Sequence, residues 1–115
     1  MKTILTIVIL LVLNSLVFAD VNSGTREVLL DNASVEVVRL TYPAGSESGM
    51  HTHEYPYRTA YVVQGGKLEL VPADGRQPSQ VLEVAAGQAM FIPASTHNVR
   101  NIGATEIIII ETEIK

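Results

Sequence analysis

Apolar and polar residues alternate with a period of two through most of the chain after residue 25, which is typical of half-buried strands. No window after residue 20 carries a helical apolar stripe of useful length. We therefore predict an all-β domain of about nine short strands, the even spacing expected of a sandwich or barrel. The clearest expected strands are residues 26–30, 34–42, 58–63, 67–71, 81–84, 89–92, 98–102 and 106–114.

The last expected strand contains four consecutive isoleucines at residues 107–110. An apolar run on both faces predicts a central strand that is covered on both sides. An uncovered strand edge invites pairing with another chain, so residues 105–114 would be a candidate surface for a partner if they lay at a sheet edge.

The first nineteen residues have the features of an export signal. Lys2 precedes an apolar run over residues 3–13, and the small residue Ala19 marks a plausible cleavage point. The alternative, an uncleaved anchor, needs about 20 mostly apolar residues, and Asn14 and Ser15 interrupt this stretch. We therefore predict a signal peptide at 1–19 and one mature domain at 20–115, periplasmic or secreted, with no stable membrane span after cleavage.

Composition removes several classes of function. The chain has no cysteine, which excludes a disulfide framework and thiolate metal sites. Its formal net charge is −4 and no basic stripe is present, so nucleic acid is not an expected partner. The absence of Trp also argues against an aromatic platform for stacking bases.

Three histidines carry the most specific chemistry in the sequence. His51 and His53 are two positions apart, which in a strand places both imidazoles on one face. His97 comes at the start of another expected strand. Neutral imidazoles suit a divalent transition metal such as Fe, Mn, Ni or Zn. The alternative is that the three side chains only pack or form hydrogen bonds, because two histidines at this spacing are common without metal.

Two glycine-bounded segments surround these histidines. The first has the spacing Gly45-x5-His51-x-His53-x4-Arg58-x6-Gly65, and the second has the spacing Gly87-x5-Pro93-x3-His97-x3-Asn101. Both closely resemble the two motifs of the cupin superfamily, and the resemblance covers the chain from about residue 35 to its end. It implies a jelly-roll β-barrel (double-stranded β-helix) with His51, His53 and His97 as metal ligands at its mouth. The end of the chain, residues 110–115, is also similar to that of small cupins linked with β-alanine degradation.

Arg58 departs from the cupin pattern, which usually has a glutamate ligand at this position. A guanidinium group stays protonated and cannot bind a metal, so only the three histidines and open positions remain. The resemblance extends to cupin dioxygenases with three-histidine sites, some of which hold a substrate carboxylate with an arginine. This implies a substrate-binding role for Arg58, with Tyr55 and Tyr57 lining the mouth. The opposing interpretation is that Arg58 pairs with Glu54 or Glu111 and that the pocket binds metal poorly.

The leading functional hypothesis is an exported, metal-dependent small cupin. The resemblance also implies a homodimer, because small cupins commonly pair through edge strands or exposed sheet faces. As an enzyme it would be a dioxygenase that acts on a small carboxylated or enolisable compound, and its ligand is expected to be anionic. The alternative is a non-catalytic module that binds or senses a metal or small ligand, because a fold does not determine a function. Two further residues are assigned structural roles: Tyr61 in core packing and Asn101 in cross-strand hydrogen bonding.

Overall fold

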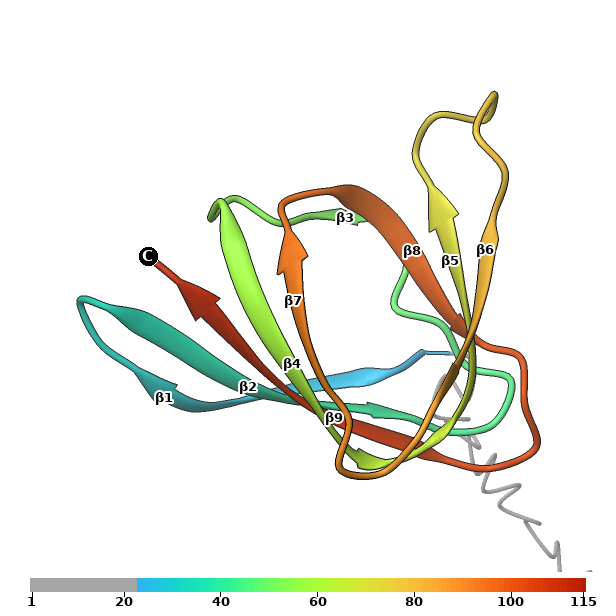
Figure 1. Ribbon diagram of the computed structural model, residues 1–115, viewed down its shortest axis with the longest axis horizontal. Coiled ribbons are helices and arrows are strands. Elements are labelled where there is room, and N and C mark those ends of the chain that lie inside the picture. Colours follow the sequence, from blue (N-terminus) through green and yellow to red (C-terminus); the bar gives the residue numbers. More distant parts are fainter. Residues whose placement is uncertain (1–22) are drawn as a thin grey trace, which may run out of the picture.

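The computed structural model describes residues 23–115, which form two antiparallel sheets that face each other (Figure 1). The larger sheet has the strand order β1-β2-β9-β4-β7 and the smaller one the order β3-β8-β5-β6. The strands are β1 (Thr25–Asp31), β2 (Val35–Tyr42), β3 (His51–Thr52), β4 (Tyr57–Gln64), β5 (Gly66–Pro72), β6 (Gln80–Val84), β7 (Ala89–Pro93), β8 (Thr96–Asn101) and β9 (Ile107–Ile114). This architecture confirms the predicted all-β jelly roll.

The leader expected at residues 1–19 lies outside the described residues. No helix within residues 23–115 is long and apolar enough to cross a bilayer.

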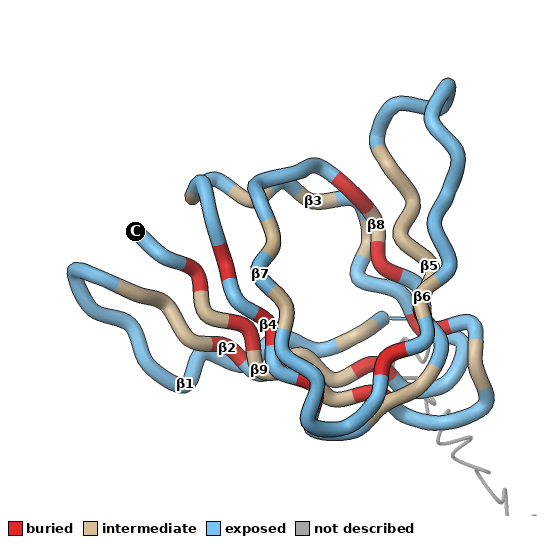
Figure 2. The backbone as a smooth tube through the Cα atoms, viewed as in Figure 1, coloured by how far each residue is buried: buried red, intermediate tan, exposed pale blue. Residues whose placement is uncertain are grey.

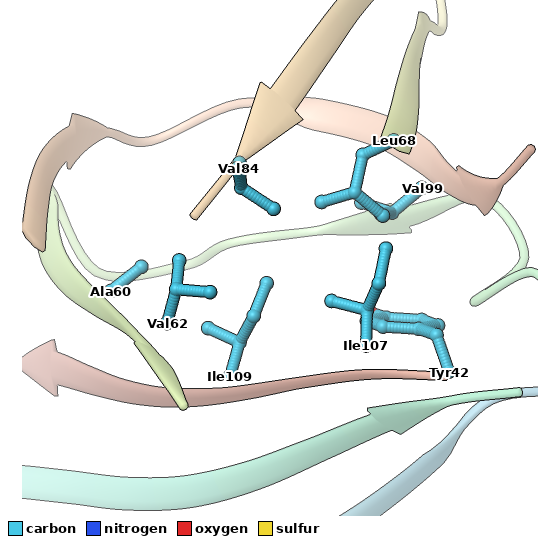
Figure 3. Close-up of a cluster of buried hydrophobic side chains, with 8 residues drawn as sticks. All are labelled: Tyr42, Ala60, Val62, Leu68, Val84, Val99, Ile107 and Ile109. Atoms are coloured by element: carbon cyan, nitrogen blue, oxygen red, sulfur yellow. The ribbon is translucent and has the colours of Figure 1, made fainter. Parts of the chain in front are cut away.

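The hydrophobic core lies between the two sheets (Figure 3). Strand β4 shows how the period of two builds it, since Arg58, Ala60 and Val62 are buried while the residues between them are exposed. Figure 2 shows the buried positions concentrated where the sheets face each other. The core residues are Tyr42, Ala60, Val62, Leu68, Val84, Val99, Ile107 and Ile109.

Strand β9 lies in the middle of the larger sheet, between β2 and β4. Its central position confirms the prediction of a central strand from the isoleucine run. The edges of this sheet are β1 and β7, so the expectation that residues 105–114 could pair through a sheet edge is wrong. Ile107 and Ile109 point into the core, whereas Ile108 and Ile110 are only partly buried on the other side. Within residues 23–115 no second layer covers that side, contrary to the expected covering of both faces (Figure 1).

The motif glycines act through two different constraints. Gly45 has a φ of 78°, a left-handed conformation that glycine adopts without a steric penalty. Gly65 has no such φ, but a Cβ atom there would lie 2.3 Å from the carbonyl oxygen of Val84. Each glycine therefore permits a chain path that another residue would strain.

Asn101 has the structural role expected of it. Its buried side chain donates to the carbonyl oxygens of Tyr42 and Thr105, at 2.9 and 2.8 Å, and accepts from the backbone N–H of Gly103 at 3.0 Å. These bonds fix the turn between β8 and β9 to the end of β2.

Candidate metal centre

The three histidines meet because β3 pairs with β8. His51 and His97 are direct register partners in this antiparallel pair. Strand β3 has only two residues, but the pairing continues past it, since the backbone N–H of His53 donates to the carbonyl oxygen of Ser95 at 3.0 Å. The extended path keeps His51 and His53 on one side of the chain, as their spacing predicted.

The Nε2 atoms of the three imidazoles converge on one point. Nε2 of His53 lies 3.0 Å from that of His51 and 3.2 Å from that of His97. The ring centroids are 4.8 to 5.1 Å apart, and the rings are nearly perpendicular to one another. This arrangement aims three nitrogens at one shared position rather than stacking three rings.

The Nδ1 atoms on the other side of the rings have hydrogen-bond partners. Nδ1 of His51 donates to the carbonyl oxygen of Gly49 at 2.9 Å, and Nδ1 of His53 donates to a carboxylate oxygen of Glu113 at 2.6 Å. Nδ1 of His97 lies 3.1 Å from the Ser95 hydroxyl. A carbonyl or carboxylate can only accept, so the neutral His51 and His53 rings carry their proton on Nδ1 and leave a lone pair on Nε2.

These residues fit a divalent transition metal ion. Two imidazole nitrogens that each lie about 2.1 Å from a shared ion are roughly 3.0 to 3.4 Å apart at ordinary bond angles. The observed separations of 3.0 and 3.2 Å match this range. Two lone pairs at such a distance would repel each other without a proton or a cation between them.

The electrostatic environment favours the neutral form of two of the histidines, the form in which an imidazole can bind a metal. The pKa of His97 is lowered to about 4, mainly by burial and in addition by the nearby positive charges of His51, Arg58 and His53. Burial also lowers the pKa of His53, although the hydrogen bond to Glu113 opposes this shift. Both imidazoles are therefore easier to keep neutral than a free histidine, and His97 keeps its neutral form well below neutral pH.

Arg58 lies inside the barrel, where it is only 2% exposed. Its Nη1 donates to the carbonyl oxygen of Pro93 at 3.0 Å, and its Nε lies 3.3 Å from a carboxylate oxygen of Glu111. Of the two acidic partners considered from the sequence, Glu111 is the one that the structure pairs with this guanidinium group.

Two buried carboxylates on β9, Glu111 and Glu113, complete the surroundings, and the contact of Glu113 with the histidines was not predicted. Glu113 binds His53 directly, while Glu111 lies 3.7 Å from the same Nδ1 atom. Burial raises the pKa of Glu111 to about 7; the Arg58 charge opposes this rise and the Glu113 carboxylate adds to it. The sequence did contain an indication of this. Glu111 and Glu113 are an even number of positions from Ile107 and Ile109, so they lie on the same, inward side of β9.

A cavity of about 380 Å³ opens beside the histidines. Tyr55 lines it together with His51, His53, Glu54, Glu111 and Glu113, so the structure places this tyrosine at the site as expected. Tyr57 instead lies on the outward side of β4, about half exposed, with its ring stacked on Phe91 at 5.2 Å. Tyr61 is also half exposed on that side, so its assignment to the core is wrong.

The chain belongs to the cupin family, since the family model described as a cupin domain matches residues 38–112. It is 38% identical over 89 residues to the β-alanine degradation protein BauB of Pseudomonas aeruginosa, covering 76% of this chain and 90% of that protein.

Two solved structures are similar in fold. One is a cupin domain from Bordetella pertussis, with a TM-score of 0.73, 30% identity and coverage of 81% of this chain and 94% of the other. The second is a double-stranded β-helix protein from Klebsiella pneumoniae, with a TM-score of 0.64, 24% identity and coverage of 80% and 76%.

Proposed function

We propose that this cupin binds one divalent transition metal ion through Nε2 of His51, His53 and His97. The observation that carries the proposal is the combination of three converging Nε2 atoms with Nδ1 atoms held by Gly49, Glu113 and Ser95. Outer hydrogen bonds of this kind fix the ring orientation and the tautomer of metal-binding histidines. Iron, manganese, nickel and zinc are the candidate metals.

The cupin pattern usually has a glutamate ligand where this chain has Arg58. Here the glutamates of β9 bring negative charge to the site instead. Arg58 on β4 and Glu113 on β9 are register partners, and Glu111 lies against the guanidinium group. Arg58 therefore offsets one carboxylate, while Glu113 holds a negative charge behind His53. This arrangement answers the objection that a buried cation near the ligands would prevent metal binding.

The role of Arg58 is therefore proposed to be positioning. It is nearly inaccessible and is engaged by Glu111 and Pro93, so a direct grip on a substrate carboxylate would need those contacts to be exchanged. Tyr55 lines the cavity and can donate a phenolic hydrogen bond to a small ligand. Tyr57, on the outward side of β4, does not reach this ligand.

The proposed activity is oxygen-dependent conversion of a small carboxylated or enolisable compound. A metal held by three neutral histidines keeps open positions and can polarise a bound ligand. The relative BauB carries the name of a β-alanine degradation protein, which supports a small organic acid as the class of ligand. A non-catalytic binding module is the second candidate, because the same pocket can hold a metal and a ligand without turnover.

The proposed location is outside the cytoplasm. The apolar segment at residues 3–13 supports export of the chain.

Elemental analysis of the untagged chain tests the proposed metal site. The wild-type protein should carry close to one transition metal ion per chain, and His53→Ala and His97→Ala should lose it. Glu54→Gln is a matched control, because Glu54 lines the same cavity and follows His53 in the chain but belongs to neither group of candidate ligands. A wild-type protein without metal, even after anaerobic reconstitution with Fe, Mn, Ni and Zn, would refute the site.

Oxygen uptake separates the two candidate functions. The metal-loaded protein is mixed with small amino acids, keto acids and thiols while dissolved oxygen and the organic product are measured. An oxygenase consumes oxygen in proportion to product, and His53→Ala abolishes this consumption. A binding module gives a thermal shift with the ligand while oxygen and ligand remain unchanged.

A further inference from the structure

The cavity beside the histidines has an excess of acidic side chains. The carboxylates of Glu36, Glu54, Glu111 and Glu113 line it, and Arg26 is the one lysine or arginine among the described residues of its wall. A metal ion at the three histidines attracts the acid group of a ligand, but the rest of this wall attracts positive charge. The charge of the wall therefore favours a ligand that carries a cationic group in addition to its acid group.

Two of these carboxylates lie opposite each other on neighbouring strands. Glu36 on β2 and Glu113 on β9 are direct register partners in an antiparallel pair. Such partners point to the same side of a sheet with their Cβ atoms about 5 Å apart, where two like charges repel each other. Both residues line the cavity, so a cation held between them there would remove this repulsion.

Glu113 keeps one carboxylate oxygen without a donor. Its Oε1 accepts from Nδ1 of His53, whereas its buried Oε2 accepts no hydrogen bond from any described residue. Glu113 is only 6% exposed, and its register partner on the other side, Arg58, forms an ion pair with Glu111 instead. A buried carboxylate oxygen without a donor costs free energy, which a donor group on a ligand would recover.

Glu36 is held at the cavity by the edge strand. Nη2 of Arg26 on β1 donates to Oε1 of Glu36, and the arginine side chain is about half exposed. An exposed ion pair of this kind contributes little free energy, so its contacts are readily exchanged. Arg26 therefore orients Glu36 but leaves Oε2 of Glu113 without a donor.

We propose that Glu36 and Glu113 form a binding site for the ammonium group of a ligand, so that the cavity takes small amino acids in preference to simple carboxylic acids. A primary ammonium group has three N–H donors, enough to bond both carboxylates. The cavity of about 380 Å³ has room for a small organic molecule. The acid end of the ligand rests on the proposed metal site, whereas the ammonium end depends on Glu36 and Glu113.

Ligand titrations of the full chain followed by NMR test the ammonium site. The probes are 3-aminopropanoate and 4-aminobutanoate, each compared with the acid in which a methyl group replaces the ammonium group, butanoate and pentanoate. Zinc-loaded wild-type protein should bind each amino acid about 10-fold or more tightly than its partner, because hydrogen bonds between charged groups contribute at least this factor. Equal affinities within both pairs would overturn the proposal.

Glu36→Gln should abolish the preference for the amino acids. Its affinity for butanoate should stay the same or increase, because a negative charge is removed from the wall. Glu27→Gln is the matched control, since Glu27 also pairs with an arginine between β1 and β2, namely Arg39, but does not line the cavity. It loses the same charge and should keep the preference. A preference that survives in Glu36→Gln would overturn the proposal.

Propylamine separates this proposal from the metal site, because it has an ammonium group and no acid group. Metal-free wild-type protein should bind propylamine, and Glu36→Gln should weaken this binding about 10-fold. Elemental analysis of Glu36→Gln should give the metal content of the wild-type protein. If no metal is found but propylamine binds through Glu36, only the metal site is refuted. If metal is present but propylamine binding does not depend on Glu36, only the ammonium site is refuted.

Discussion

Nδ1 of His53 lies 2.6 Å from a carboxylate oxygen of Glu113, although the two residues are sixty positions apart in the chain. The contact joins the histidine cluster, built from β3 and β8, to the central strand of the opposite sheet. His53 thus depends on both sheets for its position, and its lone pair on Nε2 depends on Glu113 accepting the Nδ1 proton.

We expect Glu113→Ala to weaken metal binding about 10- to 100-fold, because His53 loses both its orientation and its negative partner. Glu113→Gln should lose less, because the amide oxygen can still accept the hydrogen bond. Competition with a chromogenic chelator measures both affinities. If Glu113→Ala bound metal as tightly as the wild-type protein, the contact would have no role in binding.

Arg58→Met should destabilise the fold by about 1–3 kcal/mol at neutral pH, because Glu111 loses its cation and its hydrogen-bond donor and must take up a proton to stay buried. The double variant Arg58→Met/Glu111→Gln removes both charges and should recover most of this loss. Urea unfolding at neutral pH measures the two free energies. Equal stability of the single and double variants would show that the ion pair is not coupled.

The stability of the metal-free protein should respond to pH through two opposing groups. The pKa of Glu111 is raised from 4.5 to about 7, so between these values the native state holds a proton that the unfolded chain releases, and stability falls as pH rises. The pKa of His97 is lowered from 6.5 to about 4, so the unfolded chain binds the extra proton and stability rises with pH over that window.

Glu111→Gln should expose the His97 contribution. In this variant the free energy of unfolding should rise between pH 4 and 6.5 more steeply than in the wild-type protein, by at least ~1 kcal/mol, since one pKa unit corresponds to about 1.4 kcal/mol. Urea titrations at several pH values test this, with the partly exposed Glu69→Gln as a control. Parallel pH profiles for Glu111→Gln and the wild-type protein would contradict it.

Asn101→Ala should cost about 2 to 4 kcal/mol, because it leaves the carbonyl groups of Tyr42 and Thr105 and the N–H of Gly103 without their partner. Asn98→Ala on the same strand is the matched control, since its side chain bonds to Ser48 and Glu47 near the surface. Similar losses in the two variants would show that the buried bonds contribute little.

The histidine cluster was predictable from two sources. Two residues two positions apart share a side of an extended chain, which places His51 beside His53. His97 is distant in the sequence, and its place beside them was implied by the resemblance to the cupin motifs. The environment of Arg58 was not predictable to the same degree. Its contact with Glu111 depends on the register between β4 and β9, which pairs Arg58 with Glu113, a residue distant in the sequence.

The tyrosines show a second limit. Tyr55 and Tyr57 are two positions apart and were assigned to one mouth, but the chain bends between them before β4 begins. Tyr57 then follows the alternation of β4, in which Arg58 points inward and its neighbours point outward. A period of two gives the two sides of a strand, but it does not say which side faces the core when polar residues such as Arg58 are the buried ones.

The position of β9 also governs the order in which the molecule can be completed. The last strand of the chain lies between β2 and β4, so the larger sheet stays divided until residues 107–114 are available. Pairing over such sequence separations is slow relative to local structure formation. A chain that is still being synthesised therefore has neither a closed sheet nor the two carboxylates behind His53, and the site and the fold are finished in the same step.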